Sequence, residues 1–270
     1  MDDRPIGVFD SGLGGLTTVR ELCRLLPEED IVYFGDTGRV PYGSRSRETI
    51  VKYARQDVAF LRTFDLKTIV IACGTVSTTA LDVLAAENPI PVLGVVAPAA
   101  RAAARATRSG SIGLIGTQAS IRSGAYERLI RAENPAARVL AQPCPLFVPL
   151  VENGRFRPGD VVIETVAAEY LAPLREAGVD TLVLGCTHYP LLEKVIGAYM
   201  GPEVRLINSG AEGARAAADC PCRSAALAGP GRGSCRCFVS DRQEDFSRLA
   251  STFLGWDVAQ AVEQVDISQY

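Results

Sequence analysis

The chain has 270 residues, of which 47% are hydrophobic, and this length suits one large domain or two small ones. A net charge of -3 and a pI of about 5.4 argue against a nucleic acid or an anionic membrane as a partner. No apolar run approaches the ~18 residues needed to cross a bilayer, and the acidic N-terminal stretch leads directly into a predicted strand. We therefore expect a cytoplasmic protein with no membrane segment and no signal peptide.

Short apolar runs alternate with longer amphipathic stretches along the chain. Continuous Val, Ile and Leu runs of this length predict strands that are buried on both faces. These runs occupy residues 6–9, 31–35, 68–72, 92–96, 112–116, 139–143, 181–185 and 204–208. The segments between them have helical periodicity, for example over 16–27 and 48–64. This alternation predicts an α/β fold with mostly parallel sheets and helices on both faces.

The C-terminal part of the chain has a different composition. Residues 209–237 are rich in Ala, Gly, Pro and Cys, so we expect a loop with some helix there. The pattern that follows predicts a final helix over 242–254.

Two segments of the first half are echoed in the second half. The stretch "IGVFDSG" at 6–12 resembles "IGLIGTQ" at 112–118, and "TIVIACGT" at 68–75 resembles "TLVLGCT" at 181–187. The two matches occur in the same order and at similar spacings. We therefore predict two pseudo-symmetric α/β domains that face each other.

Each echoed strand ends in a residue that can carry chemistry: Asp10, Cys73, Thr117 and Cys186. Ligands of parallel α/β sheets bind at the carboxyl ends of the strands. A cysteine at this place usually precedes a helix, whose N-terminus lowers the pKa of a thiol. The alternative is that each cysteine is a small apolar core residue.

A pair of facing thiols fits one reaction in particular, the inversion of a carbon stereocentre. One group removes a proton from one face of the carbon, and the other returns a proton to the opposite face. A dithiol redox pair is the rival interpretation, but such pairs usually have C-x-x-C spacing, which Cys73 and Cys186 lack.

Four residues have both a functional and a structural interpretation. His188, the single histidine, is an acid/base partner of Cys186, a metal ligand or a packed side chain. Asp10 is a site residue or a helix cap. Glu152 is a solvated acid or a partner of His188, and Tyr42 lies in a loop that either lines a pocket or closes a βα connection.

The other six cysteines are interpreted separately from the strand-end pair. Four of them form a C-x-C-x12-C-x-C pattern: Cys220, Cys222, Cys235 and Cys237. These four could hold zinc, or they are packed or exposed thiols. Cys23 and Cys144 are interpreted as structural positions.

The ordered motifs resemble those of the glutamate racemases, cofactor-independent bacterial enzymes of the aspartate/glutamate racemase family. The resemblance runs from about residue 5 to 210 and resumes at "FVSDRQEDFSRLASTFLG". Its most specific motif is "GCTHYP". The other matching motifs are "FDSGLGGLTTVREL", "YFGDTGRVPYG", "ACGTVS", "GTQASIRSGAY" and "PLVENG".

This resemblance implies an isomerase that interconverts L- and D-glutamate and supplies D-glutamate for peptidoglycan synthesis in the cell wall. It implies no pyridoxal phosphate, no metal, a small-molecule substrate, and a homodimer as one possible assembly. It also implies two α/β domains with the active site at their interface. The second domain, 97–208, is then inserted into the first, which consists of 1–96 and 209–270.

The resemblance also implies roles for particular residues. Cys73 would deprotonate D-glutamate with the help of Asp10. Cys186 would deprotonate L-glutamate with the help of His188, near Glu152. The expected substrate contacts are Asp10, Ser11, Tyr42, Gly43, Gly74, Thr75, Thr117, Thr187 and His188.

Gly74 departs from the family pattern, which usually has Asn after the first cysteine. A backbone N–H or a water can replace the missing amide, and a polar group left unpaired would cost about 1–3 kcal/mol. On this account, Gly74→Asn raises the affinity for glutamate. The departure leaves two alternatives open: a racemase of aspartate or another amino acid, and a non-catalytic amino-acid-binding relative.

Overall fold

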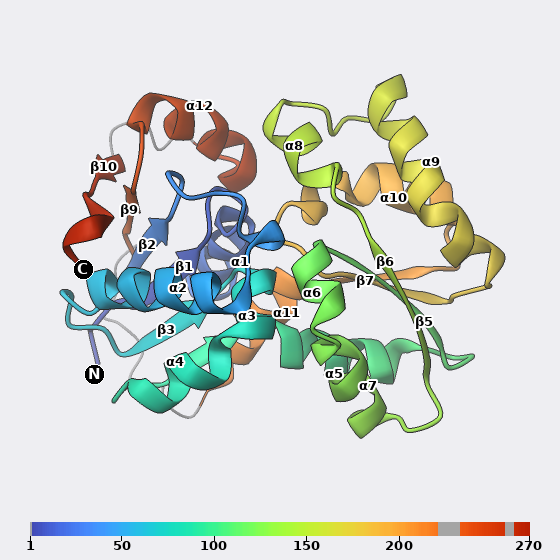
Figure 1. Cartoon of the computed structure of the whole chain (residues 1–270), viewed down its shortest axis with the longest axis horizontal. Coiled ribbons are helices and arrows are strands. Elements are labelled where there is room, and N and C mark those ends of the chain that lie inside the picture. Colours follow the sequence, from blue (N-terminus) through green and yellow to red (C-terminus); the bar gives the residue numbers. More distant parts are fainter. Residues whose placement is uncertain (1, 221–232, 257–261) are drawn as a thin grey trace.

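The computed structural model describes residues 2–220, 233–256 and 262–270. Two α/β units lie side by side, each around its own sheet, and both ends of the chain lie on the first unit (Figure 1). Among the described residues every strand pairing is parallel. The predicted α/β fold with parallel sheets is confirmed.

The first sheet has the strand order β10-β9-β2-β1-β3-β4. Its strands are β1 (Ile6–Asp10), β2 (Ile31–Gly35), β3 (Thr68–Ile71), β4 (Val92–Gly94), β9 (Cys235–Val239) and β10 (Val262–Gln264). Every residue of the three central strands is buried, as expected for strands covered by helices on both faces.

The second sheet has the order β6-β5-β7-β8. Its strands are β5 (Ser111–Gly116), β6 (Arg138–Pro143), β7 (Thr181–Leu184) and β8 (Arg205–Asn208). This order matches the β2-β1-β3-β4 part of the first sheet, so that β5 corresponds to β1 and β7 to β3. The echoed sequence segments therefore occupy equivalent positions in two related sheets, and the predicted pseudo-symmetry is confirmed.

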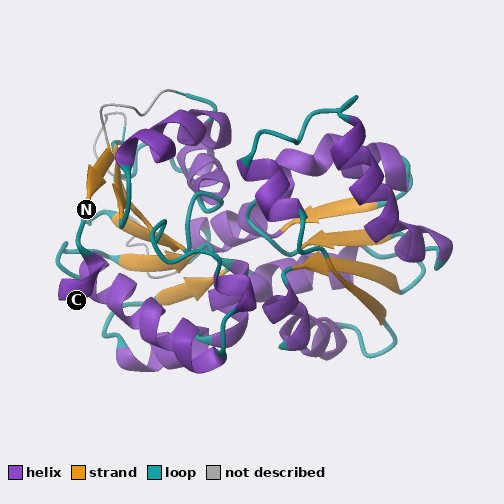
Figure 2. Ribbon diagram, turned by 45° about the horizontal axis from the view of Figure 1, so that its top comes forward, coloured by secondary structure: helices purple, strands orange, loops and turns teal. Residues whose placement is uncertain are grey.

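Helices cover both faces of each sheet (Figure 2). The first unit carries α1 (Leu16–Leu25), α2 (Arg47–Leu61), α3 (Gly74–Thr79), α4 (Leu81–Glu87), α11 (Ser209–Ala218), α12 (Gln243–Leu254) and the 3-10 turns η1 (Tyr42–Ser44) and η3 (Ile267–Gln269). The second carries α5 (Val96–Ala106), α6 (Gln118–Arg122), α7 (Ala125–Glu133), α8 (Phe147–Glu152), α9 (Val161–Glu176), α10 (Glu193–Met200) and the 3-10 turn η2 (Tyr189–Leu192). Helix α11 packs against both α1 and α5 and so joins the two units.

Helix α2 shows how the sequence specifies these elements. Its N-cap Ser46 accepts a hydrogen bond from the N–H of Thr49, which satisfies one of the free donors at the helix start. Ile50, Ala54 and Leu61 lie on its buried face at helical spacing. Burying an Ile or Leu side chain of this kind contributes about 1.5–3 kcal/mol.

All eight strands expected from the apolar runs are present, and the helix expected over 242–254 is α12. The prediction for residues 209–237 was incomplete, because β9 begins at Cys235. None of the described helices combines the length and the apolar character that a membrane span requires. The division of the chain into domains at 96/97 and 208/209 stays a prediction.

Candidate active site

Loops that follow strands of both sheets line one cavity of about 330 Å³. Every residue singled out from the sequence as a site residue, apart from Asp10, contributes to its wall. These residues are Ser11, Tyr42, Gly43, Cys73, Gly74, Thr75 and Thr117, together with Glu152, Cys186, Thr187 and His188. The cavity thus lies at the carboxyl ends of the strands, where parallel sheets bind ligands.

Cys73 follows β3 and caps the short helix α3. Its Sγ lies 3.3 Å from Oγ of Ser11. Burial and then the nearby Asp10 raise the pKa of Cys73 to about 12, although the contacts with Ser11 and with the N–H of Val76 act to lower it. Cys73 is therefore a protonated thiol at neutral pH and can act as a proton donor.

Cys186 holds the equivalent position after β7 and has a different partner. Its Sγ lies 3.9 Å from Nδ1 of His188, and Nε2 of the same ring lies 3.0 Å from Oε1 of Glu152. Burial opposes the charged imidazole, but the contacts with Cys186 and Glu152 outweigh it and raise the pKa of His188 to about 10. His188 is thus positioned to exchange a proton with Cys186 while Glu152 fixes its ring.

We expect Glu152→Gln to lower the pKa of His188 by roughly 1 pH unit, because it removes a carboxylate that favours the charged ring. The pKa of His188 is raised on folding, so the stability that this contact contributes is present below the ordinary pKa of 6.5 and is lost as the pH rises through about 10. Since His188 is the single histidine, an NMR titration of its ring protons needs no assignment. Glu133→Gln removes an exposed acid from α7 as the control, and an unchanged pKa in Glu152→Gln would refute this role.

Asp10 lies behind the wall of the cavity and is fully buried. Its carboxylate accepts hydrogen bonds from the N–H of Gly12 at 3.0 Å and from Oγ1 of Thr187 at 3.4 Å. Burial raises its pKa, although His188 and these donors act in the opposite direction. Asp10 therefore acts on the cavity indirectly, because it raises the pKa of Cys73 and accepts a hydrogen bond from Thr187. Its predicted contact with substrate stays a prediction.

The polar wall of the cavity consists largely of hydroxyl groups. Oγ1 of Thr75 lies 3.0 Å from Oγ1 of Thr117, which connects the two units. In the described part of the chain, the residues that line the cavity include no Lys or Arg. Besides the charged ring of His188, an anionic ligand would therefore be held by hydroxyl and backbone N–H donors.

Gly74 is a point of close contact between the two units. A Cβ atom at this position would lie 2.6 Å from the backbone oxygen of Gly185, which precedes Cys186. Real Cβ atoms essentially never come this close to backbone. Any side chain at position 74 must first move the two strand ends apart. The prediction that Gly74→Asn raises the affinity for glutamate did not include the cost of this movement.

One of the cysteines interpreted as structural belongs to the cavity. Cys144, at the end of β6, is buried and lines the cavity with Pro145, Val148 and Pro149 of the segment that leads to Glu152. Its place after a strand was the signal that could have identified it, as for Cys73. Cys23 lies on α1 and does not line the cavity.

The C-x-C pattern near the C-terminus lies only partly in the described residues, since Cys222 is outside them. Cys235 and Cys237 lie on β9 with their sulfurs 4.0 Å apart. Among the described residues no group of three or more His, Cys, Asp or Glu side chains could hold a metal ion. The zinc interpretation gains no support from the described cysteines.

Comparison with known proteins decides the family. The model of the family described as Asp/Glu/Hydantoin racemase matches residues 9–217. The chain belongs to this family. Within it, the chain is 49% identical over 257 residues to a glutamate racemase of Geobacter metallireducens, and the match covers 94% of each chain.

Solved structures of the family share the fold over nearly the whole chain. A glutamate racemase isoform from Bacillus anthracis superposes with a TM-score of 0.92 at 38% identity, covering 98% of both chains. A glutamate racemase from Francisella tularensis, solved in complex with D-glutamate, superposes with a TM-score of 0.91 at 36% identity, covering 100% of both. The two-unit architecture of this family member is therefore that of the glutamate racemases.

Proposed function

We propose that this protein interconverts L- and D-glutamate with Cys73 and Cys186 as the two acid/base groups, without pyridoxal phosphate or a metal. One observation carries the proposal. The two cysteines stand after equivalent strands of two related sheets and line the same cavity. Each also has its own neighbours, Ser11 and Asp10 for Cys73, and His188 and Glu152 for Cys186.

The proposed reaction moves one proton on each face of the α-carbon. The thiolate of Cys186 removes the α-proton of L-glutamate, and the thiol of Cys73 gives its proton to the opposite face of the resulting carbanion. D-Glutamate leaves, Cys186 is then the thiol, and Cys73 is the thiolate. This is the form required for the reverse reaction, so the pair returns to its starting state after one turnover in each direction or by exchange with water.

The protonated state of Cys73 indicates which direction the free enzyme is ready to run. With a pKa raised to about 12, Cys73 carries the proton that the L-to-D reaction needs. The D-to-L reaction needs Cys73 as the thiolate, which is the form that the L-to-D reaction leaves behind. Asp10 serves as a positioning residue for Cys73, and His188 is the acid/base partner of Cys186.

Glutamate is the proposed substrate because similar proteins carry that name and one of them was solved with D-glutamate. The expected contacts are those of the hydroxyl wall, Ser11, Thr75, Thr117 and Thr187, with backbone N–H groups at residues 43 and 74. We further propose that the product serves peptidoglycan synthesis in the bacterial cytoplasm. A homodimer stays a prediction.

Incubation with L-glutamate in D₂O tests the activity. We expect the circular dichroism of the amino acid to decay to zero while deuterium appears at the α-carbon. The same assay with L-aspartate is the control for the alternative substrate and should be about 10- to 200-fold slower, since a side chain one methylene shorter is rejected by about 1–3 kcal/mol in a fitted site. Absence of exchange with every acidic amino acid would favour a binding protein instead.

A further inference from the structure

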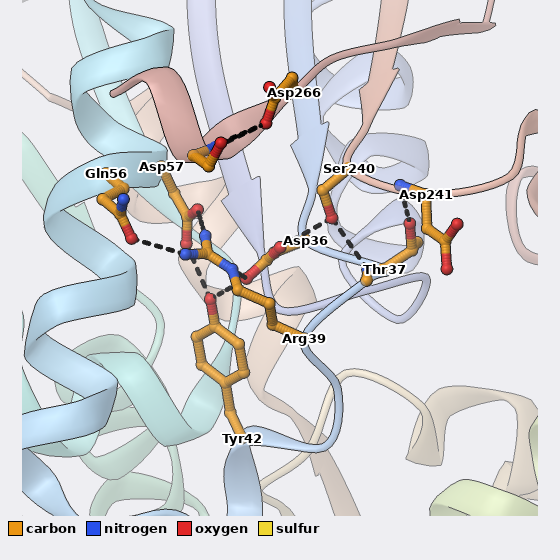
Figure 3. Close-up of polar contacts among 11 residues, drawn as sticks. Asp36, Thr37, Arg39, Tyr42, Gln56, Asp57, Ser240, Asp241 and Asp266 are labelled. Atoms are coloured by element: carbon orange, nitrogen blue, oxygen red, sulfur yellow. Dashed lines mark hydrogen bonds and ion pairs between the residues drawn. The ribbon is translucent and has the colours of Figure 1, made fainter.

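A buried polar cluster lies next to the cavity and is built from the loop after β2 and from helix α2 (Figure 3). Its centre is the guanidinium of Arg39. Nε lies 2.6 Å from Oδ2 of Asp36, and Nη2 lies 2.5 Å from Oδ1 of Asp57. Nη1 donates to Oε1 of Gln56 at 2.6 Å, and the group lies 4.3 Å above the ring of Tyr53. The side chains of both aspartates are fully buried.

The hydrogen atoms of this cluster can be counted. The hydroxyl of Tyr42 contacts Oδ2 of Asp36 and, at 2.9 Å, Oδ2 of Asp57, but it has only one hydrogen to donate. Two buried oxygens at 2.9 Å need a hydrogen between them, so one of the two carboxyl groups must supply it.

Asp36 receives more donors than Asp57, which favours Asp57 as the source of that hydrogen. Besides the contact with Tyr42, Nε of Arg39 donates to Oδ2 of Asp36, and Oγ of Ser240 donates to its Oδ1 at 2.7 Å. Asp57 has a free position on Oδ2, from which a protonated carboxyl can donate to the oxygen of Tyr42. The carboxylate of Asp36 then balances the guanidinium of Arg39, and no unbalanced negative charge is buried.

The cluster holds a wall of the cavity in place. Tyr42 lines the cavity, as do the adjoining residues 40–44. The turn η1 that contains Tyr42 packs against α6 of the second unit. On the other side, Ser240 accepts from the N–H of Gly38 at 2.8 Å, and Thr37 accepts from the N–H of Asp241 at 3.1 Å. The C-terminal segment thus ties down the same loop.

We propose that Asp57 is a neutral carboxylic acid in the folded protein, and that the chain Asp57–Tyr42–Asp36, clamped by Arg39, positions residues 40–44 as the wall of the substrate cavity. That this wall faces glutamate rests on the proposed function. The proton on Asp57 does not, because it follows from contacts and charge alone.

The surroundings of Asp57 agree with a neutral acid. Burial and then the carboxylate of Asp36 raise its pKa well above the ordinary value, whereas Arg39 and Tyr42 lower it. Tyr42 is itself held neutral, because burial and both aspartates raise its pKa. The acid of the C-terminal segment drawn nearby, Asp266, bonds to Ser268 and Gln269.

The proton can be tested through stability, with no need for activity. The unfolded chain releases this proton above its ordinary pKa of about 4, whereas the folded chain keeps it. The unfolding constant of the wild type relative to Asp57→Asn should therefore rise about tenfold per pH unit between pH 5 and pH 7. Asp65→Asn, which removes a carboxylate that is 86% exposed, is the matched control and should give a flat ratio. A flat ratio for Asp57→Asn as well would overturn the neutral acid.

The positioning role is tested by kinetics on glutamate. Asp57→Ala removes one partner of Tyr42 and one of Arg39 and should raise KM about 10-fold with a smaller change in kcat, since the cysteines lie on other loops. Asp57→Asn keeps an acceptor for Arg39 and a donor for Tyr42 and should restore most of the lost affinity.

If Asp57→Ala does not fold, Ser240→Ala, which removes one hydroxyl, should raise KM about threefold. An unchanged KM in the variant measured would overturn the positioning role. A wild type that racemises no glutamate would instead refute the proposed function and leave the stability result standing.

Discussion

Replacing either Cys73 or Cys186 with serine should reduce racemisation of glutamate by at least about 10³-fold. A serine hydroxyl is neither an effective acid nor an effective base at neutral pH, and each direction of the reaction needs both groups. Both sulfurs line one cavity but have separate partners, so neither thiol can take over the work of the other. The measurement is kcat/KM for L-glutamate and for D-glutamate, with the change in optical activity monitored by circular dichroism.

The two variants should differ in the hydrogen exchange that they retain. With Cys73→Ser, the thiolate of Cys186 can still remove the α-proton of L-glutamate and return a solvent deuteron to the same face. Exchange without racemisation is therefore expected for L-glutamate, and Cys186→Ser should show it for D-glutamate. Cys23→Ser, on α1 and away from the cavity, is the control for substitution of a thiol and should keep full activity. Full racemisation by either active-site variant would remove that cysteine from the mechanism.

The sequence was sufficient to predict the elements that depend on local pattern. Eight apolar runs became eight strands, because a strand buried on both faces must be apolar throughout. Strand β9 was missed because polar and apolar residues alternate only weakly in "CRCFV". The burial of this strand depends on its pairing with β2, about two hundred positions away in the sequence. The strand order could not be read from the chain either, although the echoed segments did indicate that the two halves are related.

The membership of the site was largely predictable, whereas its geometry was not. Residues at the carboxyl ends of strands were expected to converge, and all but Asp10 line the cavity. That Asp10 is one layer behind the wall follows from its hydrogen bonds to Gly12 and Thr187, and Thr187 belongs to the other unit. The contact of Gly74 with Gly185 likewise depends on how two separate sheets meet.

A second large effect is expected at Gly14. Gly14 belongs to the glycine-rich segment "GLGG" that leads from β1 to α1, and it faces the second unit. A Cβ atom there would lie 2.1 Å from Oγ1 of Thr187 and 2.5 Å from Nδ1 of His188. Neither group can move freely, since Thr187 bonds to Asp10 and His188 to Glu152. We expect Gly14→Ala to lower the free energy of unfolding by about 1–3 kcal/mol through overpacking.

The same substitution should lower kcat/KM for L-glutamate by about 100-fold, because displacement by 1 Å is enough to misplace an acid/base partner. Gly197→Ala on α10 is the matched control, since a Cβ there meets nothing closer than 3.8 Å, and its stability should be equal or higher. The titration of His188 separates the two effects of Gly14→Ala. If the ring is pushed away from Cys186 and Glu152, its pKa falls from about 10 toward 6.5. A loss of stability with normal kcat/KM and an unchanged pKa would mean that Thr187 yields instead, and that the position of His188 does not depend on Gly14.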